Sequence, residues 1–243
     1  MQKQKLRGTI SIIGTVIPAH EQAIRCCFVA VQRAAQHPAL MGKPVEALVV
    51  LEDCTDAPCA VATASGTATL SVRARNVGKA RNVCAQALLA RGARWHAFTD
   101  ADTVLSEARL ANQPALQADV VCGTVCVQDW SPHGAAEVKA HFGETYFERD
   151  GHRHVHGANL GVSAEAYREV GGSRQLACGA DEALVAALLA ARQQVAWSSL
   201  PNVVTSACVN ARTPAGCSGA RSNAVAQRLA GVAAPLHNAA TAA

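Results

Sequence analysis

The stretch Trp95-His96-Ala97-Phe98-Thr99-Asp100-Ala101-Asp102-Thr103 decides the fold. A short apolar run, typical of a buried strand, ends in two carboxylates that one small residue separates. In an open α/β sheet, ligands bind beyond the carboxyl ends of the strands, so both acids are expected at the binding edge. Side chains alternate along extended backbone, so Asp100 and Asp102 are expected to face the same way while Ala101 leaves room. Two such acids suit a hard divalent cation that also binds a phosphate.

The composition indicates a sizeable core and no strong charge. The chain has 243 residues, of which 50% are hydrophobic and only 4% aromatic, with a formal net charge of +4. Few aromatic residues and no Lys/Arg block give no basis for nucleic-acid binding. No apolar run approaches the roughly 18 residues that span a bilayer, and the first residues do not lead to a cleavage site. We expect a cytoplasmic protein without a transmembrane segment; its oligomeric state is not predicted.

The ten cysteines are scattered along the chain. Cys54 and Cys59, like Cys122 and Cys126, lack the spacing of zinc ligands with a partner pair. We interpret the cysteines as reduced thiols that act as small apolar side chains.

Strands and helices alternate through the first half of the chain. Continuous β-branched or apolar runs predict buried strands, and most are followed by a polar turn and a helix. This order predicts a βαβ series with a mostly parallel sheet. The strands are expected at residues 9–17, 45–51, 67–72, 95–100 and 119–127.

Ser106 is expected to cap a helix that ends near Gln117. Beyond Gln128 the elements become shorter. The later helices are expected at residues 135–147, 164–170, 181–192 and 216–230, and the later strands at residues 159–163, 195–199 and 203–206.

Six segments occur in an order that resembles family 2 glycosyltransferases with the GT-A fold. They are IPAHE (17–21), EDCTD (52–56), ARNVGKARN (74–82), TDADT (99–103), HGANLGVSAEAYREVGG (156–172) and GADEAL (179–184). The likeness extends roughly from Ile12 to Gly219 and lies in the order and spacing of the segments. It implies an α/β, Rossmann-like GT-A fold whose mostly parallel sheet is flanked by helices, with a smaller acceptor-side region.

The resemblance also implies an inverting glycosyltransferase that moves a sugar from a nucleoside-diphosphate sugar to an acceptor hydroxyl. Direct displacement needs a base for the hydroxyl proton, and a divalent cation, Mn2+ or Mg2+, neutralises charge on the leaving diphosphate. The donor-binding half is expected at residues 1–127, and the acceptor and catalytic-base half of the same domain at 128–234. Residues 235–243 are expected to form a flexible tail.

The nucleotide-binding turn of the family is matched by Pro18, Ala19, His20 and Glu21. Glu21 would also stabilise the N-terminus of the following helix, and both roles stay open. Asp53 matches the residue that binds the base of the donor, with an ordinary Asx turn as the alternative.

The basic segment before the D-x-D motif matches the family's segment beneath the donor. Gly78 permits a close backbone approach, and Arg81 offers charge to a diphosphate. Lys79 is expected on a solvated helix face.

The D-x-D motif and the end of the matched region complete the implied donor site. Asp100, Ala101 and Asp102 match D-x-D, with Asp102 as the direct metal ligand and Asp100 as a second contact to the metal or the ribose. Cys208 stands where the family has an arginine. Arg212 is expected to supply the missing positive charge.

The acceptor side is matched by the turn that contains His156, Gly157 and Asn159. The alternating His152, His154 and His156 suit a transition metal, but we favour a mobile polar loop that covers the donor.

The segment GADEAL matches the family's catalytic-base motif and places Asp181 on the base. Ala180 replaces the usual glutamate, and Glu182, also expected on the acceptor side, points about 100° away around a helix. An aspartate that opens a helix is also a good N-cap, which is the alternative for Asp181.

The departures at Ala180 and Cys208 leave a second reading open: a catalytically degenerate protein that binds a nucleotide sugar or a glycan. A sugar-phosphate nucleotidyltransferase would need a glycine-rich loop with an arginine after the first strand, which residues 18–21 do not provide. A redox or zinc protein built on the cysteines is the weakest reading.

Overall fold

The computed structural model describes residues 9–16, 24–54, 56–130 and 136–206. The chain divides into two compact units, Met1–Asp129 with Glu148–Ser206, and Trp130–Phe147 with Ala207–Ala243. All described site candidates lie in the first unit, as does the whole described sheet. The second unit contributes the helix α5 (Ala136–Thr145).

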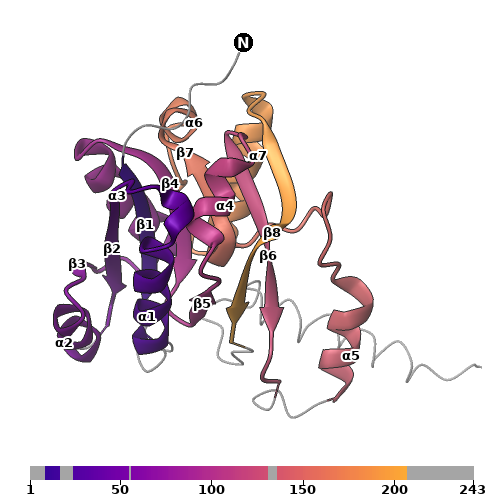
Figure 1. Ribbon diagram of the computed structural model, residues 1–243, viewed down its shortest axis with the longest axis horizontal. Coiled ribbons are helices and arrows are strands. Elements are labelled where there is room, and N and C mark those ends of the chain that lie inside the picture. Colours follow the sequence, from indigo (N-terminus) through magenta and orange to yellow (C-terminus); the bar gives the residue numbers. More distant parts are fainter. Residues whose placement is uncertain (1–8, 17–23, 55, 131–135, 207–243) are drawn as a thin grey trace, which may run out of the picture. The chain divides into compact units, whose positions relative to one another are not determined.

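Among the described residues, the strands form one mixed sheet of order β3-β2-β1-β4-β7-β6-β8-β5 (Figure 1). They are β1 (Thr9–Val16), β2 (Val45–Glu52), β3 (Ala68–Val72), β4 (Ala93–Asp100), β5 (Thr103–Leu105), β6 (Val120–Val127), β7 (Leu160–Ser163) and β8 (Val195–Thr205). The first four neighbours in this order pair in parallel, as do β6 and β8, whereas β7 runs antiparallel to β4 and β6. The predicted mostly parallel α/β sheet is confirmed. The strands β7 and β8 of the predicted second half pair with β4 and β6 of the first half, so both halves contribute to one sheet.

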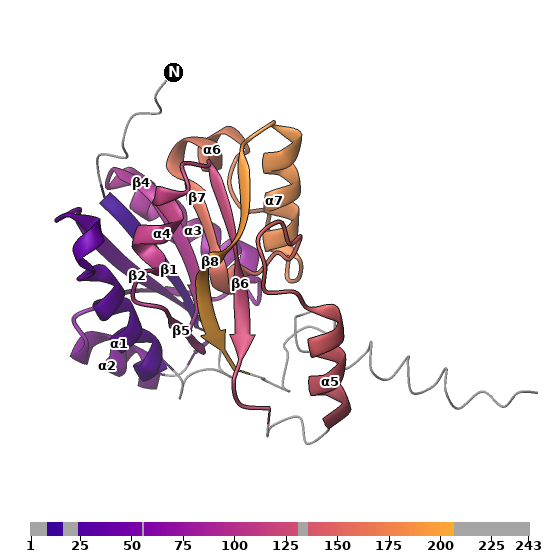
Figure 2. The same ribbon diagram turned by 45° about the vertical axis from the view of Figure 1, so that its right-hand side comes forward.

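Helices cover both faces of this sheet (Figure 2). They are α1 (Ile24–Ala35), α2 (Asp56–Ala64), α3 (Val77–Ala90), α4 (Arg109–Ala115), α6 (Ala164–Glu169) and α7 (Ala180–Ala190), with the 3-10 turns η2 (Pro38–Leu40) and η4 (Gly157–Asn159). The alternation along β2 separates the two layers: Leu48 and Val50 pack in the cluster that contains α3, α6 and α7. Val49 and Leu51 pack against α1 and α2.

Several elements differ from the sequence prediction. β8 continues through Pro201 as one strand, because its pairing with β6 shifts register there instead of ending. Neither α2 nor the three-residue β5 was predicted. Ser106 is not a helix cap: α4 follows Ala108, and the Ser106 hydroxyl donates to the Asn202 carbonyl at 3.0 Å. The predicted helix at 216–230 and tail at 235–243 lie outside the described residues.

The described cysteines are free thiols. Burial raises the pKa of Cys27, Cys84 and Cys122 to about 12, so these thiols are protonated at neutral pH. This agrees with their interpretation as small apolar side chains. None of the described helices is long and apolar enough to cross a membrane.

A buried histidine on β4 makes stability depend on pH. His96 is 0% exposed and packs edge-on to Tyr167, with ring centroids 5.2 Å apart. Ser11 donates its hydroxyl to the Trp95 carbonyl and lies 2.6 Å from His96 Nδ1. Burial, with a smaller effect of Arg168, lowers the pKa of His96 from 6.5 to about 4. The imidazole is therefore neutral in the folded protein at neutral pH.

We expect the free energy of unfolding to be constant above about pH 6.5 and to fall towards pH 4, because only the unfolded chain takes up this proton. The difference between a pKa of 6.5 and about 4 corresponds to a loss of about 3 kcal/mol. Urea denaturation across this range checks it. His96→Phe should flatten the dependence, and the control His37→Asn, at the half-buried N-cap residue of η2, should keep it. Equal pH dependence in wild type and His96→Phe would contradict the assignment.

Candidate functional site

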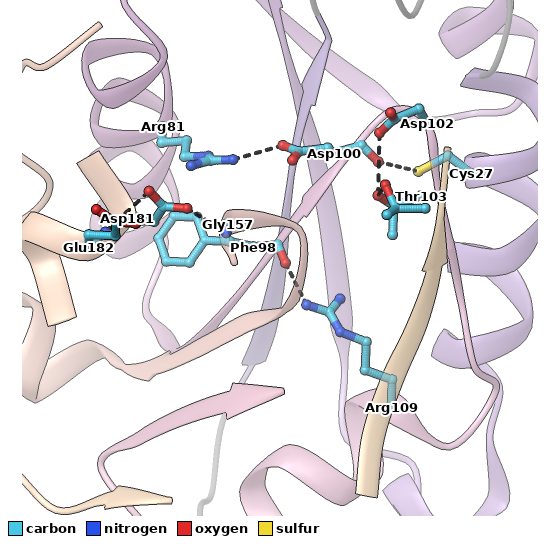
Figure 3. Close-up of polar contacts among 11 residues, drawn as sticks. Cys27, Arg81, Phe98, Asp100, Asp102, Thr103, Arg109, Gly157, Asp181 and Glu182 are labelled. Atoms are coloured by element: carbon cyan, nitrogen blue, oxygen red, sulfur yellow. Dashed lines mark hydrogen bonds and ion pairs between the residues drawn. The ribbon is translucent and has the colours of Figure 1, made fainter. Parts of the chain in front are cut away.

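The D-x-D motif lies where β4 ends. Asp100 is the last residue of the strand, and Ala101 and Asp102 form the turn into β5. The Asp100 carboxylate points towards Arg81, whereas Asp102 lies beside Thr103, whose hydroxyl donates to it at 3.4 Å (Figure 3). The turn breaks the alternation of an extended backbone, so the expectation that both acids face the same way is wrong.

Two sides of the turn are already occupied by protein. Ala101 is 2% exposed and packs with Ile24 and Phe28 of α1. Its side chain therefore belongs to the core, and the prediction that it leaves room for a donor is corrected. Asp102 also accepts a hydrogen bond from the Ser206 hydroxyl at the end of β8.

Arg81 is the buried centre of the site. Its side chain comes from α3, and the residue is 7% exposed, with Nη2 donating to Asp100 Oδ1 at 2.8 Å. Burial alone would lower the pKa of Arg81, but the negative charges of Asp100 and Asp181 outweigh it and raise the pKa above its ordinary value. A charged guanidinium thus lies between the two acids.

Asp181 approaches the same centre from α7. Its Oδ2 accepts the Gly157 amide at 2.7 Å, and Oδ1 accepts the Glu182 amide at 3.1 Å. The helix begins at Ala180 with Gly179 as its N-cap residue, so the N-cap alternative for Asp181 is wrong. Glu182 is exposed, while Asp181 is half-buried.

The fold therefore brings together acids from both predicted halves of the chain. Asp100 ends the central strand β4, and Asp181 lies in the first turn of α7. Both flank Arg81 and the Gly157 turn in Figure 3. This places Arg81 in an ion pair instead of leaving it free for a diphosphate.

Gly157 is small because the Arg81 guanidinium fills the space beside it. A Cβ on Gly157 would lie 2.2 Å from Arg81 Nη1. We expect Gly157→Ala to push the guanidinium away from Asp100 and to lower the free energy of unfolding by about 1–3 kcal/mol, as measured by urea denaturation. Gly143→Ala in α5 is the control, since a Cβ there meets nothing within 4 Å. Equal effects of the two substitutions would refute this packing constraint.

A second acid lies at the end of β2. Asp53, with a positive φ of 51°, accepts a hydrogen bond from Arg75 Nε at 3.2 Å. The preceding Glu52 is 0% exposed and accepts the backbone amide of Asn76, the N-cap residue of α3. Glu52, which sequence reasoning did not select, thus holds the loop that leads into α3. Asp53 stays a predicted donor contact.

Gly78 serves packing between protein segments. A Cβ there would lie 2.1 Å from the Arg174 carbonyl oxygen and 2.9 Å from the Cβ of Ala180. The close approach that Gly78 permits is therefore to the chain's own backbone, which corrects its predicted contact with the donor. Lys79 is exposed, as expected.

Asn159 is a structural residue and not an acceptor contact. It is 0% exposed, and its Nδ2 donates to the carbonyls of Thr124 at 2.7 Å and Pro201 at 2.6 Å. Its Oδ1 accepts from Arg109 Nε at 2.9 Å. The predicted acceptor role of the Asn159 side chain is wrong. His156, which precedes η4, is half-buried and stays a predicted acceptor contact.

The histidine-rich segment 149–156 is anchored to β8. Asp150 accepts hydrogen bonds from the Ser198 hydroxyl at 2.9 Å and the Ser199 amide at 2.8 Å, and these bonds lower its pKa. His152 is 5% exposed and hydrogen-bonds through Nε2 to the Ser198 carbonyl at 3.4 Å. These contacts oppose the predicted mobile cover over the donor.

The described part of the chain gathers no group of three His, Cys, Asp or Glu that could hold a metal. Asp100 and Asp102 nevertheless offer carboxylate oxygens at the binding edge of the sheet, the ligand type that Mg2+ and Mn2+ prefer. Asp100 is paired with the charged guanidinium of Arg81, whereas Asp102 accepts hydrogen bonds from the neutral hydroxyls of Thr103 and Ser206, so Asp102 fits a cation better. Water and a diphosphate would have to supply the other ligands.

A cavity of about 780 Å³ lies away from these acids. Its lining includes Ile10 and Trp95, which lie near the N-terminal ends of β1 and β4, and Asp119, which precedes β6. None of the predicted site residues that the structure describes lines it. The predicted residues Pro18, Ala19, His20, Glu21 and Arg212, together with Cys208, lie outside the described residues.

Solved structures share this architecture at low sequence identity. TarS of S. aureus aligns with a TM-score of 0.60 and 12% identity, over 82% of this chain and 36% of TarS. The mannosyltransferase PcManGT from Pyrobaculum calidifontis, in complex with GDP-Man and Mn2+, aligns with a TM-score of 0.56 and 16% identity, over 82% of this chain and 57% of its own. The chain has the GT-A fold.

The alignment with a third GT-A structure covers a larger share of that protein. Glucosyl-3-phosphoglycerate synthase from Mycobacterium tuberculosis, in complex with Mn2+ and UDP-glucose, aligns with a TM-score of 0.57 and 17% identity, over 92% of this chain and 78% of its own. This chain spans about a third of TarS and under three fifths of PcManGT. No protein-family profile and no curated protein sequence matches it.

Proposed function

We propose that the chain is an inverting glycosyltransferase that moves a sugar from a nucleoside-diphosphate sugar to an acceptor hydroxyl. One observation carries the proposal: Asp100 pairs with the buried Arg81, and Asp181, which also acts on the charge of Arg81, binds the adjacent Gly157 amide. The GT-A fold supports it by analogy, since fold alone does not specify a reaction.

Asp181 is the proposed general base. Its carboxylate is half-buried and is oriented by backbone amides on both oxygens, which fixes it without neutralising it. It would take the proton of the acceptor hydroxyl while the oxygen attacks the anomeric carbon from the side opposite the leaving diphosphate. This displacement inverts the configuration at that carbon.

Asp102, with Asp100 as a second contact, would hold the divalent cation. When bound, such a cation neutralises the negative charge that develops on the leaving diphosphate. The structures of PcManGT and of the mycobacterial synthase contain Mn2+ together with GDP-Man and UDP-glucose respectively, which supports a cation and a nucleotide-sugar donor here. Asp53 is the proposed contact to the donor base, and Arg81 positions Asp100.

Ala180 fits a site with a single base. Its side chain is 4% exposed and faces Gly78 across the contact between α7 and α3. A glutamate there would collide with α3, so this chain has no room for the second acid of the family's motif. The loss of that acid favours one alternative: a protein that binds a nucleotide sugar or a glycan without turnover.

Calorimetric titration with UDP, GDP, CDP and TDP, each with Mn2+, Mg2+ or a chelator, tests the donor site. The proposal predicts that one nucleotide binds and that the cation strengthens its binding. Binding without sugar transfer would favour the non-catalytic alternative. A lack of binding by all four nucleotides would contradict the proposed transferase and would leave only a glycan-binding protein from the alternative.

A further inference from the structure

Arg109, at the start of α4, is a buried arginine that no sequence motif marks. Its side chain is fully enclosed; Nε donates to Asn159 Oδ1 at 2.9 Å, and Nη2 donates to the Phe98 carbonyl. Its Nη1 has no hydrogen-bond partner among the described residues. Burial lowers the pKa of Arg109 to about 10, so the guanidinium remains charged at neutral pH.

Burying a charge on neutral acceptors is unfavourable, and an apolar side chain of the same length would fill this space at a lower cost in stability. The arginine is the one type of side chain here whose rigid fork reaches a strand carbonyl and a side-chain amide together. The contacts of Arg109 therefore indicate a geometric task. Because it is 0% exposed, it cannot touch a substrate.

The first contact fixes the end of β4. The Phe98 carbonyl lies two residues before Asp100, on the strand that carries the D-x-D turn (Figure 3). Nearby Asp100 also raises the pKa of Arg109 against the larger effect of burial, so the two charges interact. Asp100 thus forms a direct ion pair with Arg81 and also interacts electrostatically with Arg109, which comes from α4.

The second contact fixes the turn η4. The side chain of Asn159 makes four hydrogen bonds. Its Nδ2 donates to two backbone carbonyls, and its Oδ1 accepts from Arg109 and from Gln113. A Cβ on Gly123 would lie 2.2 Å from Asn159 Nδ2, so the Asn159 amide fills the space that the glycine leaves on β6. A fixed Asn159 holds Gly157 at the other end of η4.

We propose that Arg109 is a positioning residue that sets the D-x-D strand and the Gly157–Asp181 contact relative to each other. It acts through the Phe98 carbonyl on one side and through Asn159 on the other. The Gly157 amide, which donates to Asp181, is the readout of this arrangement. The geometric claim stands by itself, and its consequence for catalysis rests on the proposed function.

The test compares Arg109→Met, Arg109→Lys and a control, Val50→Ala, at a buried β2 residue whose side chain takes no part in these hydrogen bonds. NMR-detected hydrogen exchange at the Gly157 amide is measured relative to amides that exchange by global unfolding. In Arg109→Met we expect Gly157 to exchange about tenfold faster on this scale, with a smaller effect in Arg109→Lys and none in Val50→Ala. Unchanged exchange in both Arg109 variants, or equal acceleration in Val50→Ala, would overturn the proposal.

Arg109→Lys keeps the charge and supplies a second route to the answer if Arg109→Met does not fold. In a transfer assay we expect it to lower kcat while the KM for the donor stays unchanged, because the donor contacts remain but the base is misplaced. A wild-type kcat in Arg109→Lys would overturn the catalytic part. If the wild-type protein itself shows no transfer, the proposed function fails, and the exchange at Gly157 still decides the positioning role.

Discussion

Asp181→Asn should retain donor binding and lose sugar transfer. Asparagine has nearly the same shape and can still accept the Gly157 amide, which Asp181 binds at 2.7 Å, but it cannot take a proton. A positioned general base contributes about 10²–10⁴-fold, so we expect kcat to fall by a factor in this range with little change in the KM for the donor. Steady-state kinetics of nucleoside-diphosphate release measure both quantities.

The matched control is Glu182→Gln, which removes the same charge from the neighbouring, exposed side chain. We expect this variant to keep a kcat close to that of wild type, with any effect confined to the KM for the acceptor, because Glu182 is a predicted acceptor-side residue. If Asp181→Asn keeps its activity within about twofold of wild type, Asp181 is not the base. A loss of equal size in both variants would instead assign the effect to the charge of the helix terminus.

Asp102→Ala should remove the metal dependence of nucleotide binding. Asp102 fits a divalent cation better than Asp100, because it accepts hydrogen bonds from neutral hydroxyls, whereas Asp100 is paired with the charged Arg81 at 2.8 Å. We expect affinity for the preferred nucleoside diphosphate in Mn2+ to fall by about 10–100-fold, to the level measured with a chelator. Calorimetry with and without Mn2+ gives this comparison directly.

Glu107→Ala is the control for this experiment, since Glu107 is an exposed acid a few residues further along the chain. It should leave the effect of Mn2+ unchanged. Thermal unfolding of both variants separates a loss of binding from a loss of the fold. Wild-type enhancement by Mn2+ in Asp102→Ala would remove this residue from the metal site.

The parts of the fold that the sequence predicts are those with strong local signals. The runs that form β1, β2 and β4 are continuous and apolar because both faces of a central parallel strand are buried. The acid at the end of β4 and the start of α7 near Asp181 follow from the same local reading. Short or irregular elements lack such signals: β5 has three residues, and β8 continues through a proline.

The candidate site was only partly predictable for a different reason. Asp100, Gly157 and Asp181 are marked by motifs, but the residue that connects them, Arg81, is matched as a donor ligand and is found in an ion pair. Asn159 looks like a ligand in a polar turn, yet its hydrogen bonds are all made within the core.

Such assignments depend on contacts between distant segments, which residue spacing does not contain. Arg109 is the clearest case. One arginine at the start of a short helix has no local signal, and its role arises from a carbonyl on β4 and an amide in η4. The predicted cytoplasmic location and the role of Arg212 stay predictions.

The central claim is sugar transfer from a nucleotide donor, and nucleoside-diphosphate release tests it most directly. Wild-type protein is incubated with UDP-, GDP-, CDP- and TDP-sugars, Mn2+ and a panel of sugars that offer acceptor hydroxyls, with water as the default acceptor and with Asp181→Asn in parallel. The account predicts that one donor class releases its nucleoside diphosphate with wild type and Mn2+, and that a chelator or the Asp181→Asn substitution abolishes the release. Binding of a donor with no release beyond that of Asp181→Asn would contradict it and identify a nucleotide-sugar-binding protein.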